Sequence, residues 1–263
     1  MKRLLLLFVF SFSLMFAKEK VRIIPVERSQ ENENVKVYIV FPEENQLLNT
    51  SEVMMQVRVR GFPLGISSNM ERDKEIYDSK TGQSLHVIVD NNPYFLRTGP
   101  SLAPYDEEGN YYEAMYRFKI PFELSQGKHI LRVFPCRSFN ESLKQSNCFV
   151  ASVFYIQNKR SNIDQNLSDP YVTYNEPSGY IRYKYKDPIL LDFYLTNCEL
   201  SQDGYKVLIT IDEDIKRLLV NWTPYYIYGL SKGKHSIRMQ LVDKNLKQIP
   251  GAFNDTLRNF NVE

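Results

Sequence analysis

Two stretches of the chain decide the fold, because each repeats the other. Residues 122–133 read Phe-Glu-Leu-Ser-Gln-Gly-Lys-His-Ile-Leu-Arg-Val, and residues 228–239 read Tyr-Gly-Leu-Ser-Lys-Gly-Lys-His-Ser-Ile-Arg-Met. The shared pattern is Leu-Ser-x-Gly-Lys-His-x-Leu/Ile-Arg. Glycine adopts a positive φ without steric cost, so the pattern predicts a turn that leads into a strand. A match of this length indicates a tandem duplication of one β-module.

The surroundings of the two copies also correspond. Each copy follows a predicted strand that ends in an acid, at Asp90 and Asp212. Asp90 precedes the repeat histidine His129 by 39 positions, whereas Asp212 precedes its counterpart His235 by 23. The first copy therefore carries an insertion, which we place at residues 92–112.

Alternation of apolar and polar residues is the dominant pattern outside these stretches. In residues 205–212, for example, Tyr205, Val207, Ile209 and Ile211 would share one face of a strand. Such alternation is typical of antiparallel sheets with one buried face, and no long amphipathic helix competes with it. Further strands are predicted at 35–41, 57–60, 85–89, 130–134, 150–156, 189–195 and 236–241.

The turn at Gly127 and Gly233, with the strand that follows it, resembles the late turn and strand of immunoglobulin-like and fibronectin type III-like modules in exported bacterial proteins. The resemblance implies an all-β chain of two tandem immunoglobulin-like antiparallel β-sandwich domains. We expect the domains at 35–156 and 171–263, joined by a polar linker at 157–170. Residues 18–34 form a lead-in, of which 21–26 could pair as an edge strand.

The N-terminus has the order of an export signal. Lys2 and Arg3 precede the apolar run 4–16, and Ala17 stands before a charged stretch. The run is shorter than the roughly 20 residues that a membrane-spanning helix needs, so residues 1–17 are predicted to be a cleaved signal peptide. We expect a periplasmic, cell-surface or secreted protein with no integral membrane segment after cleavage.

Charge and composition exclude several classes. The chain has 33 Lys+Arg and 31 Asp+Glu, so loss of Lys2 and Arg3 with the signal leaves 31 of each. A chain without net charge is not a nucleic-acid binder driven by counterion release. A hydrophobic fraction of 43% and an aromatic fraction of 13% exclude disorder.

The cysteines and histidines are few. Cys136 and Cys148 flank a predicted hairpin loop, where a disulfide would contribute about 3 kcal/mol; two unpaired thiols are the alternative. Cys198 has no partner in its own module. His86 could approach His129, but two imidazoles without clustered thiolates make a poor metal site, so we expect no metal and no cofactor.

No catalytic motif stands out. Three adjacent acids at 106–108 have the character of a solvated loop tip, and no nucleophile elbow, phosphate loop or zinc-protease motif occurs. We therefore expect a non-catalytic protein. The alternative is a hydrolase of envelope polymer with Asp90 or Glu107 as its acid.

Aromatic clusters give the leading hypothesis for function. One cluster lies in the inserted region and a second at 222–228, where Trp222 is expected in the core. Exposed aromatic rings on the loops of a rigid sandwich mark recognition sites, so we predict an interaction module for a protein or a surface glycan. A structural spacer without a ligand is the remaining alternative. The predicted binding residues are Tyr94, Phe95, Tyr105, Tyr111 and Tyr112.

Overall fold

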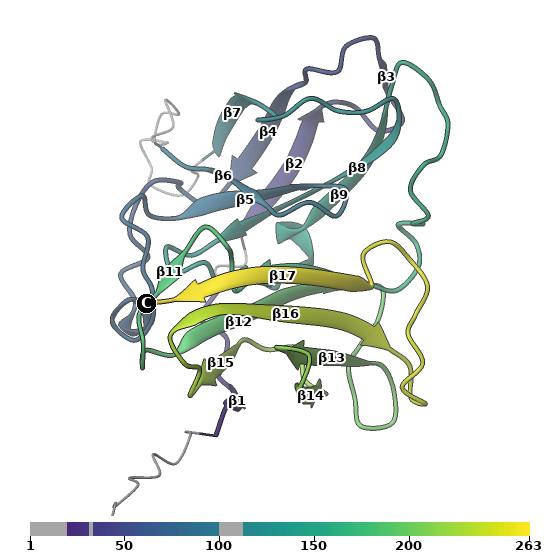
Figure 1. Ribbon diagram of the computed structural model, residues 1–263. Coiled ribbons are helices and arrows are strands. Elements are labelled where there is room, and N and C mark those ends of the chain that lie inside the picture. Colours follow the sequence, from purple (N-terminus) through teal and green to yellow (C-terminus); the bar gives the residue numbers. More distant parts are fainter. Residues whose placement is uncertain (1–19, 32–33, 100–112) are drawn as a thin grey trace, which may run out of the picture.

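The computed structural model describes residues 20–31, 34–99 and 113–263, and it confirms the all-β prediction. Two β-sandwiches are stacked on one another (Figure 1). No helix in the described ranges is both long and apolar enough to cross a bilayer. Tyr105, Tyr111, Tyr112, Glu107 and the predicted signal peptide lie outside the described residues.

The first sandwich contains eight strands and two short 3-10 turns. They are β2 (Lys36–Phe41), β3 (Leu47–Leu48), β4 (Met54–Arg60), η1 (Glu71–Lys74), β5 (Ser84–Val89), β6 (Phe95–Arg97), β7 (Glu113–Lys119), β8 (Gly127–Cys136), η2 (Ser146–Cys148) and β9 (Val150–Ile156). One sheet has the order β2-β4-β7 and the other β3-β9-β8-β5-β6.

The second sandwich repeats this topology strand for strand. Its strands are β10 (Tyr171–Glu176), β11 (Arg182–Tyr183), β12 (Ile189–Thr196), β13 (Lys206–Ile211), β14 (Ile215–Leu219), β15 (Tyr225–Tyr228), β16 (Gly233–Val242) and β17 (Asp255–Val262). They form the orders β10-β12-β15 and β11-β17-β16-β13-β14. In both sandwiches the short second strand pairs in parallel with the last strand, and every other pairing between these strands is antiparallel. This two-sheet order is that of an immunoglobulin-like or fibronectin type III-like sandwich.

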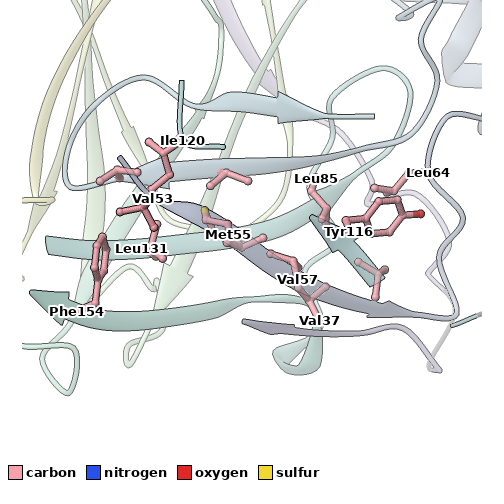
Figure 2. Packing of buried hydrophobic residues seen from close by; sticks show 14 of the residues in the cluster. Val37, Val53, Met55, Val57, Leu64, Leu85, Tyr116, Ile120, Leu131 and Phe154 are labelled. Atoms are coloured by element: carbon pink, nitrogen blue, oxygen red, sulfur yellow. The ribbon is translucent and has the colours of Figure 1, made fainter. Parts of the chain in front are cut away.

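Alternation along the strands builds each core, because successive side chains point to opposite faces. Figure 2 shows Met55 and Val57 of β4 packed toward Leu85 and Leu131 of the facing sheet. In the second sandwich Ile209, Ile237 and Met239 fill the equivalent space.

The lead-in does not stay with the first sandwich. Residues 22–25 form β1 (Arg22–Pro25), which pairs antiparallel with β15 and extends the β10-β12-β15 sheet of the second sandwich. The chain then crosses to the first sandwich, where Ser29 donates to Glu141 and Glu31 accepts from the backbone of Lys144. The N-terminal segment therefore connects the two sandwiches.

Candidate functional site

The repeat histidines lie at equivalent positions and form the same contacts. In the first sandwich, His129 Nδ1 is 2.8 Å from Asp90 Oδ2 and His129 Nε2 is 2.7 Å from the carbonyl of Ser125. The second oxygen of Asp90 accepts from the backbone of Ile130 at 2.9 Å. We call this arrangement the Asp–His clasp, because it fastens the turn before β8 to the end of β5.

The second clasp has nearly the same geometry. His235 Nδ1 is 2.6 Å from Asp212 Oδ2, His235 Nε2 is 2.7 Å from the Ser231 carbonyl, and Asp212 Oδ1 accepts from Ser236 at 2.9 Å. Gly127 and Gly233 both have a positive φ, at 112° and 125°. The histidines therefore bind the backbone of the turn, in separate sandwiches.

Both nitrogens of His129 face acceptors, so only the protonated ring can donate both hydrogen bonds. Burial alone would lower the pKa of His129, but the hydrogen bonds to Asp90 and to the Ser125 carbonyl outweigh it and raise that pKa. Asp90 is thus bound within the clasp.

The two sandwiches meet across a buried face that carries charge. Lys144 of the first sandwich and Asp192 of the second form an ion pair at 2.5 Å, with side chains 1% and 0% exposed. Asp192 also accepts from Ser142 and Asn175. Because each charged group has partners across the junction, the pair fixes the position of one sandwich against the other.

Two more ionisable side chains, His86 and Glu176, lie in this junction. His86 Nδ1 lies 2.6 Å from Asn175 Oδ1, and burial lowers the His86 pKa to about 4, so the ring is neutral. Glu176 accepts from the hydroxyls of Tyr94 and Tyr183, each at 2.5 Å. Burial raises the pKa of Glu176 to about 7 against the opposing effect of these hydrogen bonds.

A pocket of about 390 Å³ opens at the edge of the junction, with one wall from each sandwich. Asn92, Pro93 and Tyr94 contribute from the turn after β5, and Tyr180 contributes from the loop after β10. Tyr180 is 72% exposed, and its ring centroid lies 6.2 Å from that of the buried Tyr94. We call this space the junction pocket.

The remaining wall of the junction pocket comes from β17. Arg258 donates to the backbone carbonyl of Asn91 at 2.7 Å and lies over the Tyr174 ring at 5.6 Å. Leu257 and Asn259 line both this pocket and a larger hollow of about 750 Å³ over β13 and β16. The two spaces therefore share a border on the outer face of the second sandwich.

The expectation that the Tyr94 ring is exposed is wrong. It is only 4% exposed, because its ring stacks on His86 with centroids 3.9 Å apart and its hydroxyl binds Glu176. Phe95 is half-buried and packs against Phe118 and Phe122. Of the predicted binding residues, the two that the structure describes, Tyr94 and Phe95, therefore contribute to packing. Tyr94 also forms part of the pocket lining.

The predicted disulfide is also wrong, since Cys136 and Cys148 are free. Cys136 packs with Ile88 and Phe134 on the face of the first sandwich that meets the second, whereas Cys148 belongs to the core of the first sandwich. The two thiols therefore point to opposite sides of one sheet. Burial raises the pKa of Cys148 to about 12, which keeps the thiol protonated.

Trp222 packs against the second core, as expected, and its indole nitrogen donates to the carbonyl of Phe193. Within the described ranges, His, Cys, Asp and Glu form no group of three that could hold a metal ion. The exposed Tyr180 was missed by the sequence reasoning, although its Pro-Ser-Gly-Tyr context in residues 177–180 is a turn signal after a strand.

Comparisons with known proteins add little. No protein-family model matches the chain, and neither does any curated protein. Among solved structures, the fibronectin(III)-like modules of Clostridium thermocellum CbhA share 10% identity over 86% of this chain and 94% of that chain, with a TM-score of 0.29. Parabacteroides merdae β-glucuronidase shares 9% identity over 88% and 25%, with a TM-score of 0.22.

A third similarity is to SGBP-B of the Bacteroides ovatus mixed-linkage glucan utilization locus, solved with a mixed-linkage heptasaccharide. It has 12% identity over 93% of this chain and 48% of that chain, and a TM-score of 0.19. TM-scores this low carry no argument about function. The assignment to the immunoglobulin-like and fibronectin type III-like sandwiches rests on the strand order.

Proposed function

We propose that the protein is an exported, non-catalytic binding protein of the cell envelope or cell surface that takes a glycan in the junction pocket. The observation that carries the proposal is the exposed Tyr180 ring, which stands beside amide and guanidinium groups at the mouth of a pocket between two fixed sandwiches.

The chemistry of the pocket suits a sugar. An aromatic ring offers an apolar face to the C–H side of a pyranose, while Asn92, Asn259 and Arg258 offer hydrogen bonds to hydroxyl groups. Arg258 is held by Asn91 and Tyr174, so little side-chain entropy is lost when a ligand binds. The adjoining hollow over β13 and β16 adds Thr210, Ser236 and Gln240, which would serve a ligand longer than one sugar unit.

The lining of the pocket supports binding rather than hydrolysis. The junction pocket contains no carboxylate among the described residues, whereas glycoside hydrolysis ordinarily needs a pair of carboxyl groups across the bond. The adjoining hollow has Glu213 and Asp255, of which Asp255 is paired with Arg238. Asp90, one of the two acids of the hydrolase alternative, gives both oxygens to the clasp, whereas the other, Glu107, lies outside the described residues. Glu176 lies behind Tyr94 and Tyr183, where its oxygens accept from their hydroxyls.

The test is a glycan array probed with the full chain, followed by calorimetry of the strongest hit with Tyr180→Ala and Asn259→Ala. Loss of a stacking ring should weaken binding by about fivefold, since aromatic contacts contribute about 1 kcal/mol beyond their area. Tyr77→Ala removes a ring of 41% exposure outside this pocket and should bind like the parent.

Two results would count against the proposal. One is a glycan that binds Tyr180→Ala as tightly as the parent, which would place the site elsewhere. The other is a protein partner that is captured through Tyr180 while no glycan binds, which would assign the pocket to protein recognition.

A further inference from the structure

A second pocket lies on the second sandwich and differs from the first in charge. It has a volume of about 270 Å³ and is enclosed by residues 20–22, the turn 184–187 and the segment 227–230. Its floor includes Ile189, Ile227 and Val262, three side chains of the buried core. We call it the basic pocket.

Four bases line the basic pocket, namely Lys20, Arg22, Lys184 and Lys186, against the single acid Asp187. Within the described part of the chain, none of these bases forms an ion pair. The chain as a whole carries 33 basic and 31 acidic residues, so this excess is local rather than a general property of the surface. A local excess of unpaired cations around a concave site attracts an anion.

Two of the four bases are also held in place by aromatic rings. Arg22 lies over the Tyr228 ring at 5.2 Å, and Lys186 lies over the Tyr185 ring at 5.7 Å. Lys232, next to the pocket, contacts Tyr185 at the same distance of 5.7 Å. Cation–π contacts of this kind restrict long side chains before a ligand arrives, which reduces the entropy lost on binding.

The backbone brings the N-terminal segment to this place. Gly229 has a φ of +81°, and a Cβ on it would lie 3.1 Å from the carbonyl oxygen of Lys20. β1 pairs with β15 in the register Arg22 to Tyr228, which sets the guanidinium at the pocket edge. The basic pocket therefore exists only because the start of the chain joins the second sandwich.

We propose that the basic pocket binds a phosphate group. A phosphate presents several acceptor oxygens and up to two negative charges, which suits cations converging from β1 and from the turn 184–187 better than a single carboxylate would. Arginine adds a planar fork that can bind two phosphate oxygens at once. The proposal does not depend on the junction pocket, because the lining residues of the two pockets do not overlap.

Two sources could supply this group, and the experiment separates them. The full chain is titrated with inorganic phosphate and with glycerol phosphate in low salt, with NMR shifts as the readout. In parallel it is mixed with phosphatidylglycerol vesicles and with phosphatidylcholine vesicles, followed by sedimentation. Saturable shifts with the small anions identify a soluble ligand, and selective sedimentation with phosphatidylglycerol identifies a lipid headgroup.

The variants place the binding at the pocket. Arg22→Gln/Lys186→Gln should weaken phosphate or vesicle binding at least tenfold. Lys184→Gln/Lys186→Gln changes only the exposed turn. It replaces the first double variant if the substitution of Arg22 in β1 prevents folding. Lys216→Gln/Arg217→Gln on β14 removes the same charge elsewhere on this sandwich and should bind like the parent.

Either of two outcomes overturns the proposal. In the first, the phosphate anions shift the parent's NMR signals no more than chloride does, and phosphatidylglycerol vesicles sediment no more of it than phosphatidylcholine vesicles do. In the second, all three charge variants lose binding equally. The second outcome would mean that binding follows general charge and that no pocket exists for it.

Discussion

Arg132 and Arg238 occupy the same position in the repeated sequence, yet their surroundings are opposite. Arg132 of β8 is 1% exposed, donates to Thr173 of the second sandwich at 2.9 Å and to the carbonyl of Asp90, and lies 3.6 Å from the centre of the Phe253 ring. Arg238 of β16 is half exposed and forms an ion pair with Asp255.

The difference extends along both strands. The outward side chains of β8, which include Ile130 and Phe134, are covered by the second sandwich, whereas those of β16, which include Gln240, face solvent. The same motif therefore builds the same sandwich twice, and docking of one copy on the other decides which face is buried. Charges on the covered face depend on partners across the junction, and charges on the open face do not.

The sharpest way to break this comparison is to remove one carboxylate from each face. Asp192→Asn leaves the buried Lys144 without its counter-charge, and we expect a loss of about 3–5 kcal/mol in the free energy of unfolding. Asp255→Asn breaks the exposed pair with Arg238 and should cost at most about 1 kcal/mol. Urea denaturation of both variants measures the two losses.

A double variant tests whether the loss in Asp192→Asn comes from the unpaired charge of Lys144. Asp192→Leu/Lys144→Met replaces both charges by apolar groups and should recover most of the stability that Asp192→Asn loses. If Asp192→Asn and Asp255→Asn destabilise equally, the covered face does not depend on its charge pair.

The second prediction compares the two arginines directly. Arg132→Met keeps the bulk of the side chain but leaves the Asp90 carbonyl and the Thr173 hydroxyl without their donor, so we expect a loss of about 2 kcal/mol. Arg238→Met should lose less than about 1 kcal/mol. Thermal unfolding, followed by circular dichroism, ranks them; a larger loss for Arg238→Met would contradict the comparison.

Sequence patterns predicted most of the fold because it is encoded locally. Alternation located the strands, and the repeated Gly-Lys-His turn predicted two copies of one module. The expected disulfide does not form because the two cysteines lie on opposite sides of the sheet. Cys136 shares the face of Phe134, while Cys148 belongs to the core of the first sandwich. Because Cys148 lies in η2 rather than in a strand, alternation along the sequence could not show on which side of the sheet its thiol lies.

The sites were not readable in the same way, because they depend on contacts between distant segments. Tyr94 is buried by His86 and Glu176, the latter from the other sandwich. The basic pocket needs β1 to pair with β15, some 200 residues along the chain. No local sequence pattern predicts which of the two sandwiches the N-terminal strand will pair with.

The smallest expected effect concerns the pH dependence of the clasp. The folded-state pKa of His129 is raised above its ordinary value of 6.5, so its contribution to stability is fully present below pH 6.5. That contribution is lost as the pH rises through the folded-state pKa. His129→Gln should therefore flatten the decline in stability above pH 6.5.

His86→Gln provides the contrast, since burial lowers the His86 pKa to about 4. Stability linked to His86 rises with pH between about 4 and 6.5 and is constant above that range. Urea midpoints from pH 5 to pH 9 for the parent and both variants test this. Burial raises the pKa of Glu176 to about 7, so Glu176 also contributes to the slope in this range, and only differences between the three proteins are compared. A decline above pH 6.5 that is as steep in His129→Gln as in the parent would show that the clasp histidine does not titrate with folding, because no other change separates that variant from the parent.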